Sequence, residues 1–323
     1  MKNNQKVHLA LQLETDLKEK LNALFQVTEE NPDASKSEIL SAIADVEGIL
    51  GFPNLSMDAD FFDAAPNLRV LSLASVGYDF VDVDAATKRG IVICNTPGVL
   101  TNAVANLTIS MIFIITRKLI ENETFVRTGG WARGKPAPAL GTDIEGKVLG
   151  LIGFGRIGQE VARRAQALGM KTLWYDVFDT LPDGAPNSDY RKLDNLLEES
   201  DFVSLHTNLS PSARHLIGEV QLDKMKETAY LINTARGPLV DQSSLTKALK
   251  SGTIAGAALD VFESEPTAEN EPITQLTNAY CFAHIASGTE ETRRAMRELA
   301  LQNLIAVLSG NHPPAPVNPE VFK

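Results

Sequence analysis

The chain has 323 residues, with 30 Lys and Arg against 41 Asp and Glu, and a formal net charge of −11 at pH 7. Its 44% hydrophobic and 22% charged residues are typical of a globular protein that is long enough for two domains. The negative charge argues against nucleic acid as a partner, because neutralising phosphates requires clustered Lys and Arg.

Strands and helices are expected to alternate along the chain in two series. In the first series, strands are expected near 7–12, 48–50, 70–74 and 91–94, with helices near 15–24 and 36–44. The second series opens with a long helix near 102–117, and its strands are expected near 148–152, 172–175, 202–205, 230–232, 254–259 and 279–283. Helical patterns such as 243–249 separate them, and a last helix is expected over 289–308. This alternation predicts an α/β protein with parallel sheets covered by helices on both faces.

Neither a membrane span nor an oxidising compartment is indicated. The longest apolar run lies within 107–115 and falls far short of the ~20 residues that cross a bilayer. The N-terminal residues show no signal-peptide pattern. Cys94 and Cys281 lie in apolar, strand-like runs, which favours buried free thiols and a cytoplasmic protein.

A glycine-rich turn directly follows the apolar run 148–152. It reads Gly153-Phe154-Gly155-Arg156-Ile157-Gly158 and leads into a helical pattern over 159–170. Gly153 permits a tight turn, Gly155 lets a pyrophosphate approach the backbone, and Gly158 lets the helix pack close to the sheet. Free amides at the helix N-terminus suit phosphate groups, so the segment predicts a dinucleotide site.

Asp176 ends the next expected strand, 18 residues after Gly158 (176 − 158 = 18). At this place a carboxylate accepts hydrogen bonds from the adenosine ribose of a dinucleotide. Residues 177–179 contain no Arg or Lys to meet a 2′-phosphate, and the acid would repel one. The expected cofactor is therefore NAD(H) rather than NADP(H).

Polar residues follow the expected strands of the second series: Asp176, His206, Arg236, Asp260 and His284. Ligands of open parallel sheets bind outside the carboxyl ends of the strands, so these positions are expected to converge on one site. No spacing of His, Cys and acidic residues is typical of a metal site.

The residue types at these ends suit hydride transfer to a ketoacid. The guanidinium of Arg236 is able to clamp a carboxylate, although a salt bridge at a helix end is the alternative. His284 is a candidate proton donor, with an ordinary loop histidine as the alternative. A carboxylate partner is expected from Glu263 or Glu265, and His206 is expected to line the cofactor site without taking part in the chemistry.

Several motifs in this order resemble those of the D-isomer-specific 2-hydroxyacid dehydrogenases over essentially the whole chain. Within that family the chain is most similar to the glyoxylate/hydroxypyruvate reductase branch. The motifs are Ser75–Asp79, Asn95–Thr101, the glycine turn 153–158, Asn233–Gly237, Ala258–Pro266 and His284-Ile285.

The resemblance implies a role for particular residues. Arg236, Glu265 and His284 would be catalytic, with Glu265 rather than Glu263 paired with His284. The amides of Val76 and Gly77 would bind the substrate carboxylate, together with Arg236. The cofactor-binding residues would be Gly153, Gly155, Arg156, Ile157, Gly158, Asp176, His206, Thr234, Ala235, Asp260 and Ser287.

The resemblance also implies two Rossmann-like, doubly wound domains. The dinucleotide-binding domain, 100–287, would be inserted in a flavodoxin-like substrate-binding domain made of 1–99 and 288–323. A homodimer through the cofactor domains, with 102–117 and 125–140 at the interface, is the expected assembly.

The implied activity is NAD(H)-dependent reduction of a small 2-ketoacid, such as glyoxylate or hydroxypyruvate, to the D-2-hydroxyacid. D-3-phosphoglycerate dehydrogenase is the alternative enzyme, and an NAD-sensing scaffold of the corepressor type is the alternative from another class. Ala283, Ala286 and Asn106 depart from the family pattern without removing a catalytic group, and they leave the preferred substrate open.

Overall fold

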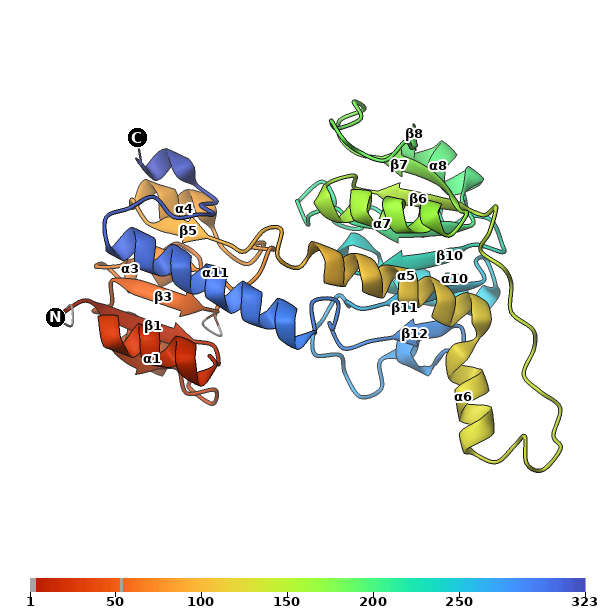
Figure 1. Ribbon diagram of the computed structural model, residues 1–323, viewed down its shortest axis with the longest axis horizontal. Helices are drawn as coiled ribbons and strands as arrows, with labels where there is room; N and C mark the ends of the chain where they lie inside the picture. The colour runs from red at the N-terminus through yellow and green to blue at the C-terminus, as the bar shows by residue number, and fades with distance from the viewer. Residues whose placement is uncertain (1–3, 53–54, 323) are drawn as a thin grey trace. The chain divides into compact units, whose positions relative to one another are not determined.

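The computed structural model describes residues 4–52 and 55–322. The chain forms two units, which are shown in Figure 1. The first unit comprises Met1–Leu100 and Thr289–Lys323, and the second comprises Thr101–Gly288. The second unit is therefore an insertion in the first.

The first unit is built on a five-stranded parallel sheet in the order β2-β1-β3-β4-β5. This is the strand order of flavodoxin-like folds. Its strands are β1 (Lys6–Ala10), β2 (Gln26–Glu29), β3 (Gly48–Gly51), β4 (Val70–Ser72) and β5 (Val92–Cys94). Its helices are α1 (Thr15–Leu24), α2 (Lys36–Ile43), α3 (Ala59–Asp63), α4 (Val83–Lys88) and α11 (Glu290–Leu308), followed by the 3-10 turn η3 (Pro319–Phe322).

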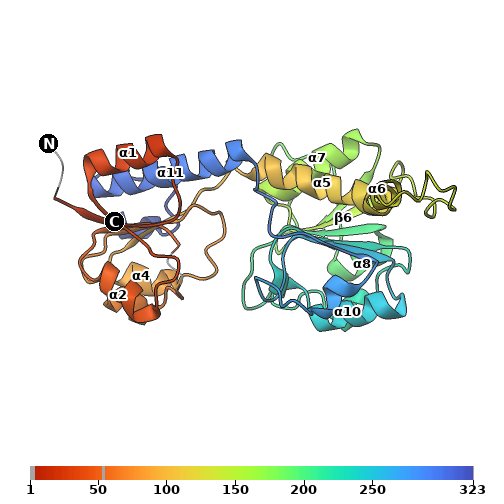
Figure 2. The ribbon, with the colours of Figure 1, turned by 90° about the horizontal axis from the view of Figure 1, so that it is seen from below.

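Helices cover both faces of this sheet, as Figure 2 shows. On one face α1 and α11 pack against side chains from β1, β3 and β4, and α11 contributes Ala300, Leu301 and Leu304 to that layer. On the other face α2, α3 and α4 enclose Ile49, Leu71 and further apolar residues. Strands buried on both sides explain the continuous apolar runs by which they were expected.

The second unit is built on a seven-stranded parallel sheet in the order β12-β11-β10-β9-β6-β7-β8. Its strands are β6 (Val148–Ile152), β7 (Lys171–Tyr175), β8 (Asp189–Tyr190), β9 (Phe202–Leu205), β10 (Tyr230–Asn233), β11 (Gly256–Leu259) and β12 (Ala279–Cys281). The chain reverses its winding direction between β6 and β9. Such a switch point is where doubly wound sheets bind dinucleotides.

Helices also lie on both faces of this second sheet (Figure 2). They are α5 (Thr101–Arg117), α6 (Leu119–Arg127), α7 (Arg156–Ala167), α8 (Leu193–Glu199), α9 (Glu219–Leu222) and α10 (Gln242–Ser251), with the 3-10 turns η1 (Gly237–Leu239) and η2 (Pro272–Gln275). α5 and α7 enclose one apolar layer, which contains Phe154 and Trp174. α8, α9 and α10 enclose the other layer. The predicted fold class, two doubly wound parallel α/β sheets, is confirmed.

Individual elements differ from the sequence expectation. β2 and β8 are sheet edges that the hydrophobic pattern did not indicate, and β2 has no buried residue. α7 begins at Arg156, inside the glycine-rich segment, rather than near 159. The amide-bearing first turn of the helix is therefore part of that segment.

α6 and the loop that follows it extend away from the rest of the second unit in Figure 1. The helix has no buried residue, and it follows α5 after a break at Lys118. Within the described ranges no single helix is long and apolar enough to cross a membrane; only α5 and α6 taken together, bent by 63°, pass by length and composition.

Candidate active site

The glycine turn lies at the switch point of the second sheet, after β6. Gly153 has φ +95, and a Cβ there would lie 2.6 Å from the His206 backbone, so only glycine fits. Gly155 is the N-cap residue of α7, and a Cβ there would meet nothing within 4 Å. No side chain caps the free amides of this helix end. An open approach beside uncapped amides fits the pyrophosphate of a dinucleotide.

Asp176 lies directly beside this turn. Its Oδ2 accepts a hydrogen bond of 2.8 Å from the Phe154 amide, and its Oδ1 accepts one of 2.7 Å from the Val177 amide. The carboxylate is thus fixed at the end of β7, next to the residues that would hold a pyrophosphate. Val177 and Phe178, which follow it, are 82% and 76% exposed. No cation follows Asp176 up to residue 190.

The turn that carries Arg236 is held by Asn233 at the end of β10. Asn233 is buried, its Oδ1 accepts a hydrogen bond from the Ala235 amide, and its Nδ2 donates one of 2.8 Å to the Arg236 carbonyl. A Cβ on Gly237 would lie 1.8 Å from the Phe262 carbonyl oxygen, so the turn packs directly on the neighbouring loop. These contacts fix the backbone of Arg236, whose guanidinium Nη1 donates to the Ala235 carbonyl at 2.7 Å.

Asp260 holds the loop after β12. It is fully buried, and its two carboxylate oxygens accept hydrogen bonds from the amides of Ile285 at 2.7 Å and Ala286 at 2.8 Å. Burial raises the pKa of Asp260 despite these hydrogen bonds. The resemblance places Asp260 on the nicotinamide side; in the structure its carboxylate binds the backbone that follows His284.

Glu265 and His284 form a pair. Glu265 Oε2 lies 2.6 Å from His284 Nδ1, and Glu265 Oε1 accepts a hydrogen bond of 2.8 Å from the Phe262 amide. Burial alone would raise the pKa of Glu265, but the hydrogen bonds from His284 and Phe262, with the charges of His284 and Arg236, outweigh it and lower that pKa below the ordinary value. Glu265 is therefore an ionised acceptor at neutral pH, which places a proton on Nδ1 of His284.

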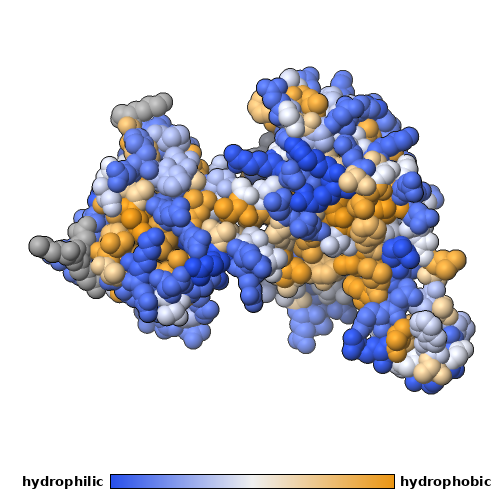
Figure 3. All heavy atoms as spheres, viewed as in Figure 1, coloured by the Kyte–Doolittle hydropathy of each residue, from blue (hydrophilic) through white to orange (hydrophobic). Residues whose placement is uncertain are grey.

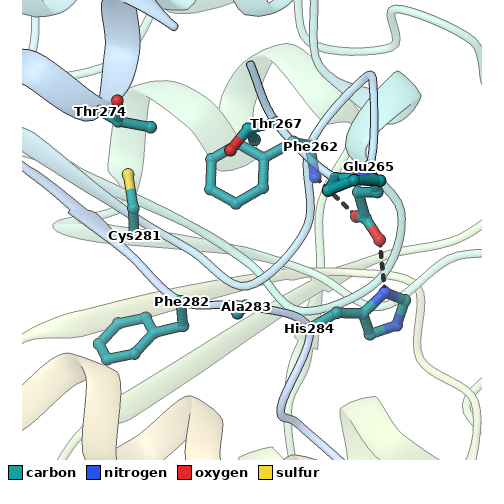
Figure 4. Close-up of a pocket in the computed structure, with 9 residues that line it drawn as sticks. Phe262, Glu265, Thr267, Thr274, Cys281, Phe282, Ala283 and His284 are labelled. Atoms are coloured by element: carbon teal, nitrogen blue, oxygen red, sulfur yellow. Dashed lines mark hydrogen bonds and ion pairs between the residues drawn. The ribbon is translucent and has the colours of Figure 1, made fainter. Parts of the chain in front are cut away.

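The other imidazole nitrogen of His284 points away from Glu265 (Figure 4). The His284 side chain is 49% exposed, and its backbone has φ +53 in the left-handed region. A cavity of about 390 Å³ adjoins the pair. Phe262, Phe282, Thr267, Thr274 and Cys281 line it together with the pair (Figure 4), so one side of the pair is largely apolar.

His206 follows β9 and faces the glycine turn. Its Nε2 lies 2.9 Å from the Ser204 hydroxyl, and burial lowers the pKa of His206 to about 3. The ring is therefore neutral at physiological pH, which agrees with a residue that lines a site without transferring protons.

The remaining cofactor candidates differ in exposure. Thr234 is buried, and its hydroxyl lies 3.1 Å from that of Thr108 on α5. Ser287 is buried after the His284 loop, whereas Arg156 is exposed and Ile157 is half-buried at the start of α7.

In the first unit, three consecutive carbonyl groups of the loop after β4 accept hydrogen bonds. The carbonyls of Ser75, Val76 and Gly77 accept hydrogen bonds from the Thr96 amide, the Asn95 side chain and the Ser75 hydroxyl, respectively. Among the described residues no acceptor is found for the Val76 and Gly77 amides. Two neighbouring amides without acceptors suit an anion.

Two hydrogen-bonding groups of the site had no role assigned from the sequence. Asn233 fixes the Arg236 turn, and Asn95 fixes the loop at Val76. Each stands in a recognisable motif, but only the fold reveals which backbone group its amide contacts.

Comparisons with known proteins show which family the chain is similar to. The model of the D-isomer specific 2-hydroxyacid dehydrogenase NAD binding domain matches residues 109–286. The glyoxylate reductase of Thermofilum pendens is 49% identical over 295 residues, which cover 90% of this chain and 86% of that protein.

Solved structures are similar over nearly the whole chain. A glyoxylate reductase from Paecilomyes thermophila superposes with a TM-score of 0.87 at 34% identity, covering 98% of this chain and 99% of that one. An NADPH-dependent glyoxylate/hydroxypyruvate reductase from Sinorhizobium meliloti, in complex with NADP and malonate, superposes with a TM-score of 0.86 at 31% identity, covering 98% and 97%. With its glycine turn, its Glu265–His284 pair and this similarity, the chain belongs to the D-isomer specific 2-hydroxyacid dehydrogenase family.

Proposed function

We propose that this protein is a dehydrogenase that reduces a small 2-ketoacid, glyoxylate or hydroxypyruvate, to the D-2-hydroxyacid with NADH. The observation that carries the proposal is the 2.6 Å Glu265–His284 pair in a chain 49% identical to a glyoxylate reductase. A general acid beside an oriented carboxylate is what reduction of a carbonyl requires.

NAD(H) would be held by the glycine turn 153–158, by the first turn of α7 and by Asp176, and it supplies the hydride. The carboxylate of Asp176 favours ribose hydroxyls and disfavours a 2′-phosphate, so NADH is the preferred form. His206, Thr234, Ala235 and Ser287 would line the same site. The buried carboxylate of Asp260 would act by holding the His284 loop.

Arg236 would bind the substrate carboxylate and polarise the adjacent carbonyl oxygen. His284 would donate the proton from Nε2 to that oxygen as the hydride reaches carbon, because Nδ1 faces Glu265. The ionised Glu265 would accept a hydrogen bond from Nδ1 and so fix the ring orientation. The net change is 2-ketoacid, NADH and a proton to D-2-hydroxyacid and NAD⁺.

The amides of Val76 and Gly77 would add two hydrogen bonds to the substrate carboxylate. Their availability supports assigning substrate binding to the first unit, while the second unit binds the dinucleotide. Closure of two such domains over bound substrate would exclude water during hydride transfer.

Initial rates with NADH and with NADPH test the function directly. Glyoxylate, hydroxypyruvate, pyruvate and 3-phosphohydroxypyruvate are compared at matched concentrations. NADH-linked turnover of glyoxylate or hydroxypyruvate is expected. Preference for the phosphorylated ketoacid contradicts the proposed substrate, and binding of NADH without turnover of any ketoacid contradicts the proposed activity.

The same protein is proposed to be a cytoplasmic homodimer. Both cysteines are free thiols, which favours a reducing compartment.

The homodimer is proposed to use the projecting segment, which consists of α6 and the loop that follows it. Five apolar side chains of this segment are exposed: Leu119 47%, Ile120 46%, Val126 51%, Trp131 72% and Leu140 93%. Figure 3 shows a mixture of hydrophobic and hydrophilic residues at the end of this segment. Light scattering of the wild type and of a Trp131→Ser, Leu140→Ser variant tests the assembly; a monomeric wild type contradicts it.

A further inference from the structure

A second histidine–glutamate pair lies in the same unit as the Glu265–His284 pair. His215 Nε2 and Glu263 Oε1 are 2.5 Å apart, and their side chains are 41% and 30% exposed. Glu263 and Glu265 stand two positions apart in one loop. Within this loop, Glu263 therefore contacts His215, and Glu265 contacts His284.

Both of these histidines have an uncommon backbone conformation. Among the described residues, positive φ at a non-glycine position is found at Lys118 (50°), His215 (52°) and His284 (53°). Such a conformation is strained and persists where the surroundings fix it, which is common at functional sites. Two of the three instances face the 263–265 loop, so His215 shares with His284 both a glutamate partner and a constrained backbone.

His215 is also tied to the turn that carries Arg236. Its amide donates a hydrogen bond of 2.8 Å to the Pro238 carbonyl, and the Ile217 amide donates one of 3.0 Å to the Leu239 carbonyl. Pro238 follows Arg236 by two residues. The backbone around His215 therefore runs along the segment that leaves this turn.

The backbone of Glu263 and of the preceding residue contacts the segment that follows Arg236. The Glu263 amide donates a hydrogen bond of 3.1 Å to the side-chain oxygen of Gln242 at the start of α10. The preceding Phe262 packs on Gly237 and donates its amide to Glu265. The side-chain pair thus joins the loop that carries Glu265 to the segment that follows Arg236.

We propose that the His215–Glu263 pair positions Glu265 and Arg236 relative to each other for hydride transfer. His215 and Glu263 act as positioning residues, which hold two catalytic side chains that lie 29 residues apart (265 − 236 = 29). This inference rests on the proposed function.

A positioning role and a purely structural role predict different effects on folding stability and on the rate of turnover. A partly exposed ion pair contributes little to folding stability. Displacement of a reacting group by about 1 Å costs as much as ~100-fold in rate. Loss of the pair is therefore expected to change turnover far more than the melting temperature.

The test uses the full-length protein with NADH and glyoxylate. Glu263→Ala and His215→Ala are each expected to lower kcat about tenfold to 100-fold while the KM for NADH stays within about twofold. The double variant is expected to lose no more than the single ones, because both remove the same contact. Glu263→Gln is expected to recover most of kcat, since its amide oxygen accepts the same hydrogen bond.

Asp194→Ala is the matched control. It removes an exposed ion pair with Lys224 in the same unit, and wild-type kcat is expected. If Glu263→Ala matches Asp194→Ala in kcat, the pair is only a surface ion pair and the inference is overturned. If Glu263→Ala does not fold, His215→Ala removes the same contact from the other side and decides the question.

The two proposals fail in different ways. An inactive wild type with all four ketoacids overturns the proposed function and, with it, this inference. An active wild type with fully active Glu263→Ala and His215→Ala variants overturns the positioning role alone.

Discussion

The two parallel sheets differ in the side chains that follow their strands. In the seven-stranded sheet, β7, β9, β10, β11 and β12 are followed by ionisable residues: Asp176, His206, Arg236, Asp260 and His284. In the five-stranded sheet, β4 and β5 are followed by Leu73–Gly77 and by Asn95-Thr96, which carry no charge. Two sheets of the same doubly wound architecture therefore carry different chemistry at equivalent ends.

This difference assigns separate tasks to the two units. A carboxyl edge rich in ionisable groups is suited to proton transfer and to binding a charged cofactor. The ends of β4 and β5, which offer free amides and no charge, are suited to holding an anion by hydrogen bonds alone. Substitutions of Asp176 and His284 in the second unit are therefore expected to change cofactor choice or kcat, and those at the loop after β4 in the first unit to change the KM for the ketoacid.

The largest expected effect belongs to His284. His284→Ala removes the proposed general acid, so kcat is expected to fall about 10²–10⁴-fold while NADH binding, followed by fluorescence, is retained. His312→Ala, which removes an exposed histidine of the first unit, serves as control and is expected to leave kcat unchanged. Near-normal turnover of the His284 variant would contradict the assignment of proton transfer to the residues that follow the strands of the seven-stranded sheet.

A substitution of Asp176 tests how the residues that follow the strands of the seven-stranded sheet select the cofactor. Asp176→Ala removes an ionised acceptor, so NADH affinity is expected to fall about tenfold or more, and the kcat/KM ratio of NADH over NADPH is expected to fall with it. Asp179→Ala removes a nearby exposed acid and is expected to keep the wild-type ratio. An unchanged ratio in the Asp176 variant would separate this carboxylate from ribose binding.

The sequence was most informative where local pattern and fold coincide. β6, the glycine turn, α7 and β7 follow one another without interruption, so hydrophobic runs and glycine spacing indicated them. β2 and α6 were not indicated because neither buries a side chain, and without burial there is no hydrophobic period to detect. Edge strands and projecting helices with no buried side chain therefore cannot be predicted from the hydrophobic pattern of the sequence.

The candidate site shows the same limit. The sequence left Glu263 and Glu265 as alternatives, and the resemblance favoured Glu265 as the partner of His284; the 2.6 Å contact agrees. The contact of Glu263 with His215, 48 positions away, was not predicted, because nothing in the chain signals a pairing over that separation. The contact of Asn303 with the Asn95 carbonyl, across 208 positions, is equally invisible before the fold is known.

Asn95 tests the uncharged segments that follow β4 and β5 in the first unit. Asn95→Ala removes the hydrogen bond to the Val76 carbonyl, which contributes about 1 kcal/mol, so the KM for glyoxylate is expected to rise about fivefold with little change in kcat. Asn278→Ala removes a comparable amide-to-backbone contact in the second unit and is expected to change stability but not this KM. A fall in kcat with unchanged KM in the Asn95 variant would contradict the division of tasks.

The smallest effect on turnover is expected for a substitution of His206. This substitution tests whether every ionisable residue that follows a strand of the seven-stranded sheet takes part in proton transfer. Burial disfavours the charged ring and lowers its pKa to about 3 from an ordinary 6.5. The ring therefore stays neutral between pH 5 and pH 9 in the folded protein. The lowered pKa of Glu265 likewise keeps that carboxylate ionised over this range.

His206→Asn is therefore expected to leave the pH profiles of ketoacid reduction and hydroxyacid oxidation unchanged in shape between pH 5 and pH 9. It should also weaken the acid sensitivity of folding, because between pH 6.5 and 3 the unfolded chain binds a proton at His206 that the folded protein does not, so stability falls as the pH falls. A profile that moves with His206→Asn would mean that a second histidine at this edge exchanges protons during turnover.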